Sequence, residues 1–247
     1  MFREGGVAKT EERVILHCDL NNFFASVSLL FNPTLRSVPV AVCGDKEQRH
    51  GIVLAKNEAA KRCGVKTAEA IFEAKAKCPE LVILPPMMDK YKEYSEKAHR
   101  IYEEYTDMIE PFGIDECWLD VTGSRLLFGS GEEIADKIRR EIKQKLGITV
   151  SVGVSFNKVF AKLGSDMKKP DGITVISREN FREKIWRLPI SDLLFVGRKT
   201  TDRLRSCGIC TIGDAAVCSG SSIMPQKKNY DPGSTLRSRA SHFYSYL

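Results

Sequence analysis

The chain has 247 residues, 43% hydrophobic and 28% charged, a balance that excludes a disordered or fibrous protein. All of its formal charge of +6 lies in residues 177–247, which fits either an electrostatic hold on a polyanion or a mildly basic soluble protein. No apolar run approaches the roughly 18–20 residues of a membrane-spanning helix, and the polar residues 1–13 predict no signal peptide.

Strands and short helices are expected to alternate from the N-terminus. The apolar residues 14–18 predict a strand that ends at Asp19, and an asparagine that follows, Asn21 or Asn22, is expected to cap a helix. Further apolar runs predict strands over residues 38–42, 51–54 and 81–84. Helices are expected over residues 58–63 and 67–77, the second closed by Pro79.

A long helix is predicted over residues 89–107, because its apolar side chains recur every three or four residues on one face. This stripe indicates a core face rather than a cofactor site, and it consists of Tyr91, Tyr94, Ala98, Ile101, Tyr102 and Tyr105. Strands are then expected over residues 109–112, 117–121 and 148–154, and helices over residues 132–146 and 158–166. Because strands and helices interleave across residues 12–176, the fold class is α/β or α+β.

The basic segment that begins at residue 177 is predicted to hold only short helices. Its glycines, among them Gly197 and Gly208, resemble the turns of a helix-hairpin-helix, in which backbone N–H groups approach DNA phosphates. From Ser219 the chain is rich in Ser, Lys, Arg and Pro without apolar periodicity. Residues 219–247 are therefore expected to form a disordered basic tail.

The eight cysteines are too sparse to indicate a disulfide scaffold in a chain of this length. Cys18, Cys43 and Cys117 fall within apolar runs, so we interpret them as reduced core residues of a cytoplasmic protein. Cys207 and Cys210 have CxxC spacing. A single such pair, without a second pair or histidines at zinc spacing, favours a structural role.

Three acidic residues stand beside apolar strands, Asp19 at the end of one and Asp115 and Glu116 between two others. Convergent carboxylates suit Mg²⁺, and two such ions can activate a 3′-hydroxyl and stabilise a leaving pyrophosphate. The spacing alone leaves open a hydrated Asp-Glu turn and an unrelated helix-capping aspartate. Because adjacent strand residues face opposite ways, Asp115 and Glu116 converge only if the backbone turns or bulges there.

Three segments resemble the catalytic motifs of the Y-family DNA polymerases, in the family's order and at its intervals: residues 19–27, 113–122 and 151–172. The resemblance extends over residues 12–216 and is strongest to the DinB, or DNA polymerase IV, branch. It implies an α+β fold with a palm of mixed β-sheet and packed helices. The implied boundaries are palm 12–22 and 88–176, small α/β fingers 23–87, and a helical thumb with the helix-hairpin-helix 177–218.

The resemblance also implies roles for individual residues. Asp19, Asp115 and Glu116, with the main-chain carbonyl of Leu20, would hold two Mg²⁺ ions. Basic side chains of the thumb would hold the DNA duplex; they are Arg198, Lys199, Arg203 and Arg205.

Four residues are expected to contact the nucleotide. Phe24 matches the steric gate that excludes a ribose 2′-hydroxyl, and Phe23 would flank the triphosphate. Lys169 and Lys61 would meet the triphosphate as point charges. Without the resemblance, Phe24 would be interpreted as a core phenylalanine and Lys169 as a solvated loop lysine.

The sequence departs from the family pattern in several places. Glu58 and Lys61 stand where the family usually has Tyr and Arg, so Lys61 loses the bidentate fork and Glu58 is expected to turn away from phosphate. Ser28 replaces a usual Glu, and Gly113 replaces a usual Ser. The family's little-finger domain has no match after the thumb. We therefore expect a chain truncated there, with poor primer-template affinity.

The function implied is that of a template-directed, DNA-directed DNA polymerase of the translesion type, with low fidelity and low processivity. Its expected partners are primer-template DNA and deoxynucleoside triphosphates, and its expected setting is DNA repair and the SOS response in the cytoplasm, as a monomer off the membrane. No sliding-clamp motif is visible. The alternatives are a catalytically weak or inactive DNA-binding remnant and a palm-fold nucleotidyl cyclase that binds no DNA.

Overall fold

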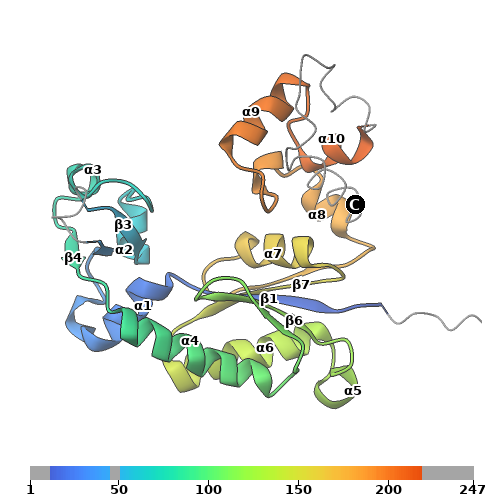
Figure 1. Ribbon diagram of the computed structural model, residues 1–247, viewed down its shortest axis with the longest axis horizontal. Helices are drawn as coiled ribbons and strands as arrows, with labels where there is room; N and C mark the ends of the chain where they lie inside the picture. The colour runs from blue at the N-terminus through green and yellow to red at the C-terminus, as the bar shows by residue number, and fades with distance from the viewer. Residues whose placement is uncertain (1–11, 45–50, 219–247) are drawn as a thin grey trace, which may run out of the picture.

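The computed structural model describes residues 12–44 and 51–218, so the expected disordered tail lies outside the described residues. Two separate sheets organise this part of the chain, one of five strands in the order β5-β6-β1-β7-β8 and one of three in the order β3-β2-β4. Figure 1 shows the smaller sheet beside one end of the larger one, and the last helices above it. The fold class is α+β.

The five-stranded sheet is built around β1 (Ile15–Leu20), which is buried along its whole length. It pairs antiparallel with β6 (Glu116–Asp120) on one side and with β7 (Val150–Ser155) on the other. The edges are β5 (Ile109–Pro111) and β8 (Ile173–Ile176), and β8 runs parallel to β7. The strand β8 was not predicted, because it is only four residues long and directly follows a turn.

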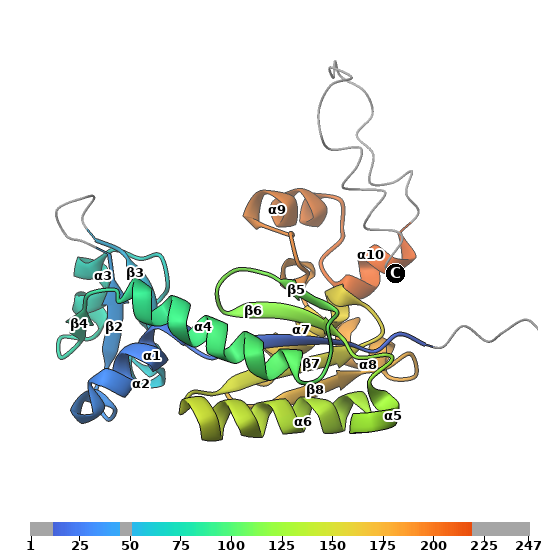
Figure 2. The same ribbon diagram turned by 60° about the horizontal axis from the view of Figure 1, so that its bottom comes forward.

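Helices cover both faces of this sheet. Figures 1 and 2 show α4 (Met88–Glu103) and α6 (Gly131–Glu141) on one face and α7 (Lys158–Met167) on the other. The predicted stripe is core, although Tyr94 is only half-buried and Tyr105 lies beyond α4, which ends four residues before the predicted helix does. The helix expected over residues 132–146 continues from α6 as a π-helical turn, Ile142–Leu146, and stops at Gly147, whose φ is 70°.

Glycines let α7 lie directly on the sheet. A Cβ on Gly153 of β7 would stand 1.9 Å from the carbonyl oxygen of Ala161 and 2.5 Å from the backbone nitrogen of Ser165, both on α7. One on Gly164 of α7 would stand 3.2 Å from the Cα of Gly153. Side chains of any size at these two positions would push the helix away from the strands.

The three-stranded sheet pairs β2 (Val40–Cys43) antiparallel with β3 (Val53–Lys56) and parallel with β4 (Val82–Leu84). It shares a second core with α2 (Glu58–Arg62) and α3 (Ile71–Lys77). The helix predicted from residue 67 begins only at Ile71, because Ala68 has a φ of 66° that a helix cannot contain. The strand predicted from residue 51 begins at Val53, and Ile52 forms only an isolated bridge to Ala70.

Between residues 177 and 218 the structure contains only short helices, as predicted: α8 (Phe181–Ile185), a 3₁₀ turn (Ile190–Asp192), α9 (Arg198–Ser206) and α10 (Ile212–Val217). Gly208, with a φ of 80°, turns the chain between α9 and α10. A third core joins these helices to Phe160 and Leu163 of α7. Two further short elements, the 3₁₀ turn Pro33–Leu35 and α5 (Arg125–Phe128), were not predicted.

Candidate active site

The pairing of β1 with β6 brings together two of the predicted carboxylates. Asp19 lies directly opposite Glu116 in the register of the two strands, although 96 positions separate them in the sequence. Asp115 stands just outside β6, and its carbonyl accepts a hydrogen bond from the Leu20 N–H at 2.9 Å. The backbone bends between Gly113, whose φ is 88°, and Glu116. This bend meets the condition under which neighbouring acids converge.

These acids line one polar cleft of about 290 Å³ between the two sheets. Leu20, Phe23 and Phe24 of the predicted site line it as well, together with Lys169. The remaining lining residues are Asn22, Leu54, Ala55, Lys56, Thr67, Lys162 and Asp166. Seven of the eight predicted metal and nucleotide residues therefore share one cleft, and Lys61 is outside it.

Two lysines neutralise much of the negative charge. The Lys162 Nζ lies 2.9 Å from Glu116 Oε2 and 3.1 Å from Asp19 Oδ2. The Lys169 Nζ lies 2.6 Å from Asp19 Oδ2 and 2.8 Å from Asp166 Oδ1. Burial would lower the pKa of Lys162, but Asp19, Glu116 and Asp166 outweigh burial and raise it. Both ammonium groups therefore stay charged and hold Asp19 from two sides.

The carboxylates titrate in opposite directions. Burial, followed by the charges of Asp19 and Glu116, raises the pKa of Asp115 to about 6. Burial acts in the same direction on Glu116, but its close contacts with His17 and Lys162 prevail and lower its pKa to about 2. Burial and the negative charge of its two neighbours therefore both favour the protonated form of Asp115. A set of hard oxygen donors with residual negative charge fits a divalent cation such as Mg²⁺.

A histidine that the sequence analysis missed lies behind Glu116. His17 is fully buried on the face of β1 that carries Asp19, with Nε2 3.3 Å from Glu116 Oε2 and Nδ1 2.9 Å from Ser165 Oγ. Alternation along a strand could have placed His17 on the face of Asp19. Its partners on β6 and α7 could not have been identified, because they depend on the register of distant segments.

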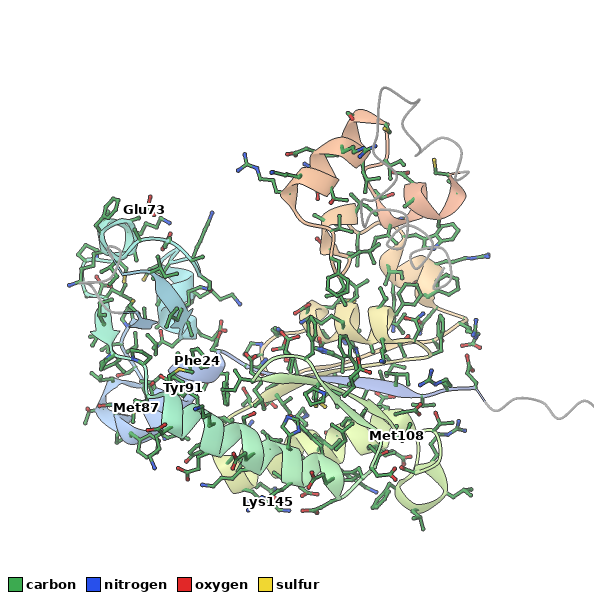
Figure 3. The ribbon with its side chains drawn as sticks, in the orientation of Figure 1. Phe24, Glu73, Met87, Tyr91, Met108 and Lys145 are labelled. Carbon is green, nitrogen blue, oxygen red and sulfur yellow. The ribbon has the colours of Figure 1, made fainter. Side chains whose placement is uncertain are left out.

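The two phenylalanines follow Asn22 at the start of α1 (Phe23–Phe31). Phe24 stacks on Tyr91, with ring centroids 4.2 Å apart and planes at 9°, and Figure 3 labels both residues. Phe23 is buried. Asn22 occupies the N-cap position in a left-handed conformation, but its side chain makes no capping bond. It donates instead to Glu58 Oε1 at 2.9 Å, so the predicted capping interaction is wrong.

The prediction for Lys61 is not supported by its position. Its Nζ lies 3.7 Å from Glu58 Oε1 on the same short helix, and its side chain is 52% exposed. Glu58 is also outside the cleft lining, in keeping with the expectation that it turns away. Lys56 of β3 lines the cleft in their place, and its Nζ donates to Thr67 Oγ1 at 2.9 Å. Lys56 reaches the cleft because it is the last residue of β3, and the family's fingers motif does not include it.

The basic side chains predicted to bind DNA all project from α9 into solvent: Arg198, Lys199, Arg203 and Arg205. Thr201 is the buried residue of this helix and donates to the Gly197 carbonyl. Contact between DNA and these four basic side chains of α9 stays a prediction. Cys18, Cys43 and Cys117 are buried and form no disulfide, as predicted, whereas Cys207 and Cys210, which also form none, are exposed.

A family profile described as the impB/mucB/samB family matches residues 18–166. A DNA polymerase IV of Acetivibrio thermocellus is 59% identical over 215 residues, which are 87% of this chain and 54% of that protein. DNA polymerase IV 1 of Bacillus subtilis is 40% identical over 217 residues, which are 86% of this chain and 51% of that protein. The chain spans about half the length of the curated relatives it matches.

Solved structures agree with these relatives. An insertion ternary complex of Dbh DNA polymerase is 32% identical, with a TM-score of 0.78 over 83% of this chain and 61% of that one. DinB from Sulfolobus solfataricus is 30% identical, with a TM-score of 0.78 over 94% of this chain and 65% of that one. Across residues 12–44 and 51–218, no helix is long and apolar enough to cross a membrane.

Proposed function

The chain belongs to the impB/mucB/samB family of Y-family DNA polymerases, and from this premise we propose that it adds deoxynucleotides to a primer 3′-hydroxyl under the direction of a template. One observation carries the proposal: Asp19, Asp115 and Glu116 line a single cleft with three lysines and Phe24. We further propose synthesis of the translesion type, in the bacterial cytoplasm. The relatives named DNA polymerase IV support this proposal.

The carboxylates would hold the metal that such a reaction requires. Asp19, Asp115 and Glu116, with the Leu20 carbonyl, would provide the oxygen ligands for two Mg²⁺ ions. When bound, the ions would supply activation of the 3′-hydroxyl and neutralisation of the leaving pyrophosphate. His17 would keep the Glu116 carboxylate in place from behind, because Nε2 lies 3.3 Å from Oε2 in a fully buried ring.

The nucleotide would lie between the two sheets. Phe24 would act as the steric gate, and its stacking on Tyr91 supports this role because a ring held flat against another ring cannot swing aside. Tyr91 is fixed in turn, since its hydroxyl lies 2.7 Å from Ser28 Oγ in the interior. Lys169 and Lys56 line the cleft and would meet the triphosphate.

The remaining assignments follow the family. We propose that the five-stranded sheet is the palm (12–22 and 88–176), the three-stranded sheet and its helices are the fingers (23–87), and the last helices are the thumb (177–218). The exposed arginines and lysine of α9 would hold the duplex through its phosphates, so affinity should fall steeply with salt.

Single-nucleotide primer extension with Mg²⁺, at low salt and high enzyme concentration, tests the proposal. The Asp115→Asn/Glu116→Gln variant should lose extension, while Glu103→Gln/Asp107→Asn, which neutralises two exposed acids outside the cleft, should keep it. Retained DNA binding without extension by the parent would instead support a DNA-binding protein without turnover. Extension by the Asp115/Glu116 variant would overturn the assignment of the cleft.

A further inference from the structure

Three metal-ligating side chains meet on the three-stranded-sheet side of the molecule, outside the cleft. They are Cys63, Cys78 and Glu80, whose two sulfurs and one carboxylate oxygen all lie within 4.8 Å of one another. None of the three lines the cleft described above. Cys63 directly follows α2, Cys78 directly follows α3, and Glu80 precedes β4. Figure 3 labels Glu73 on α3, the helix that ends at this cluster.

The packing of two short helices creates this convergence. Ala60 of α2 and Ala74 of α3 are fully buried in one core, so the two helices share an interior face. Each helix then ends with a cysteine N–H bonded back to its last turn, Cys63 to the Ala59 carbonyl and Cys78 to the Ala74 carbonyl. These backbone hydrogen bonds fix the positions of both cysteines, so the two thiols lie side by side.

Burial decreases stepwise across the cluster, since Cys78 is 1% exposed, Cys63 is half-buried and Glu80 is exposed. An ion from solution can therefore reach the sulfurs along the glutamate, and a water molecule can complete the coordination on the open side.

We propose that Cys63, Cys78 and Glu80 bind one thiophilic divalent cation of the Zn²⁺ or Cd²⁺ class, with water as the fourth ligand. Thiolate sulfur selects such ions over Mg²⁺, and four-coordinate Zn²⁺ accepts sulfur and carboxylate ligands together. Each thiol gives up its proton to solvent on binding, so two protons are released per ion. The ion would tie the C-terminal ends of α2 and α3 together across the 14 residues between the cysteines. This inference does not depend on the proposed polymerase activity.

Titration of the reduced, metal-stripped chain with Cd²⁺ tests the proposal, because cadmium–thiolate bonds give an ultraviolet charge-transfer band. The parent is expected to bind one equivalent and to release two protons. Cys63→Ser should abolish the band, and because Cys63 is half-buried this variant should fold, which circular dichroism checks. Glu80→Gln should weaken binding by at least the roughly 10–100-fold that loss of a supporting group costs a metal site.

Two matched variants locate the site. Cys207→Ser/Cys210→Ser removes the exposed CxxC pair and should leave the band unchanged, as should Asp115→Asn/Glu116→Gln in the cleft. The proposal is overturned if the parent shows no band in excess Cd²⁺, if the band survives Cys63→Ser, or if air oxidation links the two thiols while the reduced chain binds no metal. Each readout is independent of primer extension, so failure of one proposal does not affect the other.

Discussion

The two sheets of this chain contribute to one cleft in different ways. The five-stranded sheet provides Asp19 and Glu116 from strands whose backbone register fixes them opposite each other, above a fully buried β1. The three-stranded sheet provides Lys56 from the end of β3, where three of four residues are only half-buried. Groups that need fixed geometry therefore lie on the rigid sheet. Groups that need only charge lie on the smaller and more exposed one.

The largest effect is expected where the rigid sheet is most crowded. Gly153→Ala places a Cβ 1.9 Å from the Ala161 carbonyl oxygen, so α7 must move off the sheet. We expect a loss of about 3 kcal/mol or more in the free energy of unfolding, from the urea midpoint at unchanged slope. Gly123→Ala, where nothing lies within 4 Å, is the control and should change stability by less than about 0.5 kcal/mol. Equal effects would contradict the close contact of α7 with β7.

A second prediction concerns the uncompensated charge on Asp115. Its pKa is about 6 in the folded chain against an ordinary 3.8, so the folded chain binds this proton more tightly. The resulting stabilisation is present below pH 3.8 and is lost as the pH rises through 6. Asp115→Asn avoids this loss. In EDTA we expect the variant to be more stable than the parent by about 2 kcal/mol at neutral pH.

The difference between Asp115→Asn and the parent should vanish at acidic pH. Urea unfolding of the two proteins across this pH range measures the difference, in which Glu116 cancels because it titrates in both. A parent as stable as the variant at neutral pH would show that the lysines already compensate Asp115.

Removing the charge of Lys56 and removing the charge of Lys61, both in the smaller-sheet region, should affect nucleotide binding to different extents. Lys56→Met should raise the KM for the incoming nucleotide by roughly tenfold, or about 1.4 kcal/mol, because Lys56 lines the cleft. Lys61→Met should change it by less than about twofold, because Lys61 is half exposed and pairs with Glu58. Steady-state extension kinetics measures both. The reverse order would restore the role that the resemblance gives to Lys61.

The smallest effects should distinguish the two cores. Ile138→Val removes a methyl group from a fully buried position in the large core and should cost about 1 kcal/mol. Ile71→Val makes the same change in the small core at a position that is 7% exposed, where neighbours can close the gap, and should cost about 0.5 kcal/mol. Thermal unfolding of both variants checks this order, and a larger loss for Ile71→Val would show that the small core is the more tightly packed.

The sequence predicted the parts of the site that local patterns determine. Asp19 ends an apolar run, and the need for a bend at Asp115 follows from alternation along a strand, so both were predictable. Lys162 and His17 were missed because their partners depend on how β1, β6 and α7 meet. The capping bond of Asn22 was wrong because its side chain donates to Glu58 on α2 instead. The nucleotide contact of Lys61 stays a prediction that its pairing with Glu58 on the same helix does not support. The start of α3 was wrong because one positive φ at Ala68 is invisible in composition.

The two ammonium groups on Asp19 act as resident counter-ions. With Lys162 at 3.1 Å and Lys169 at 2.6 Å, the acidic end of β1 is neutralised from within the chain. Removal of metal from the cleft should therefore leave the chain folded, in contrast to proteins that fold only around their metal. A metal ion that binds in the cleft then replaces lysine contacts of Asp19 in a chain that has already folded. Folding therefore precedes metal binding.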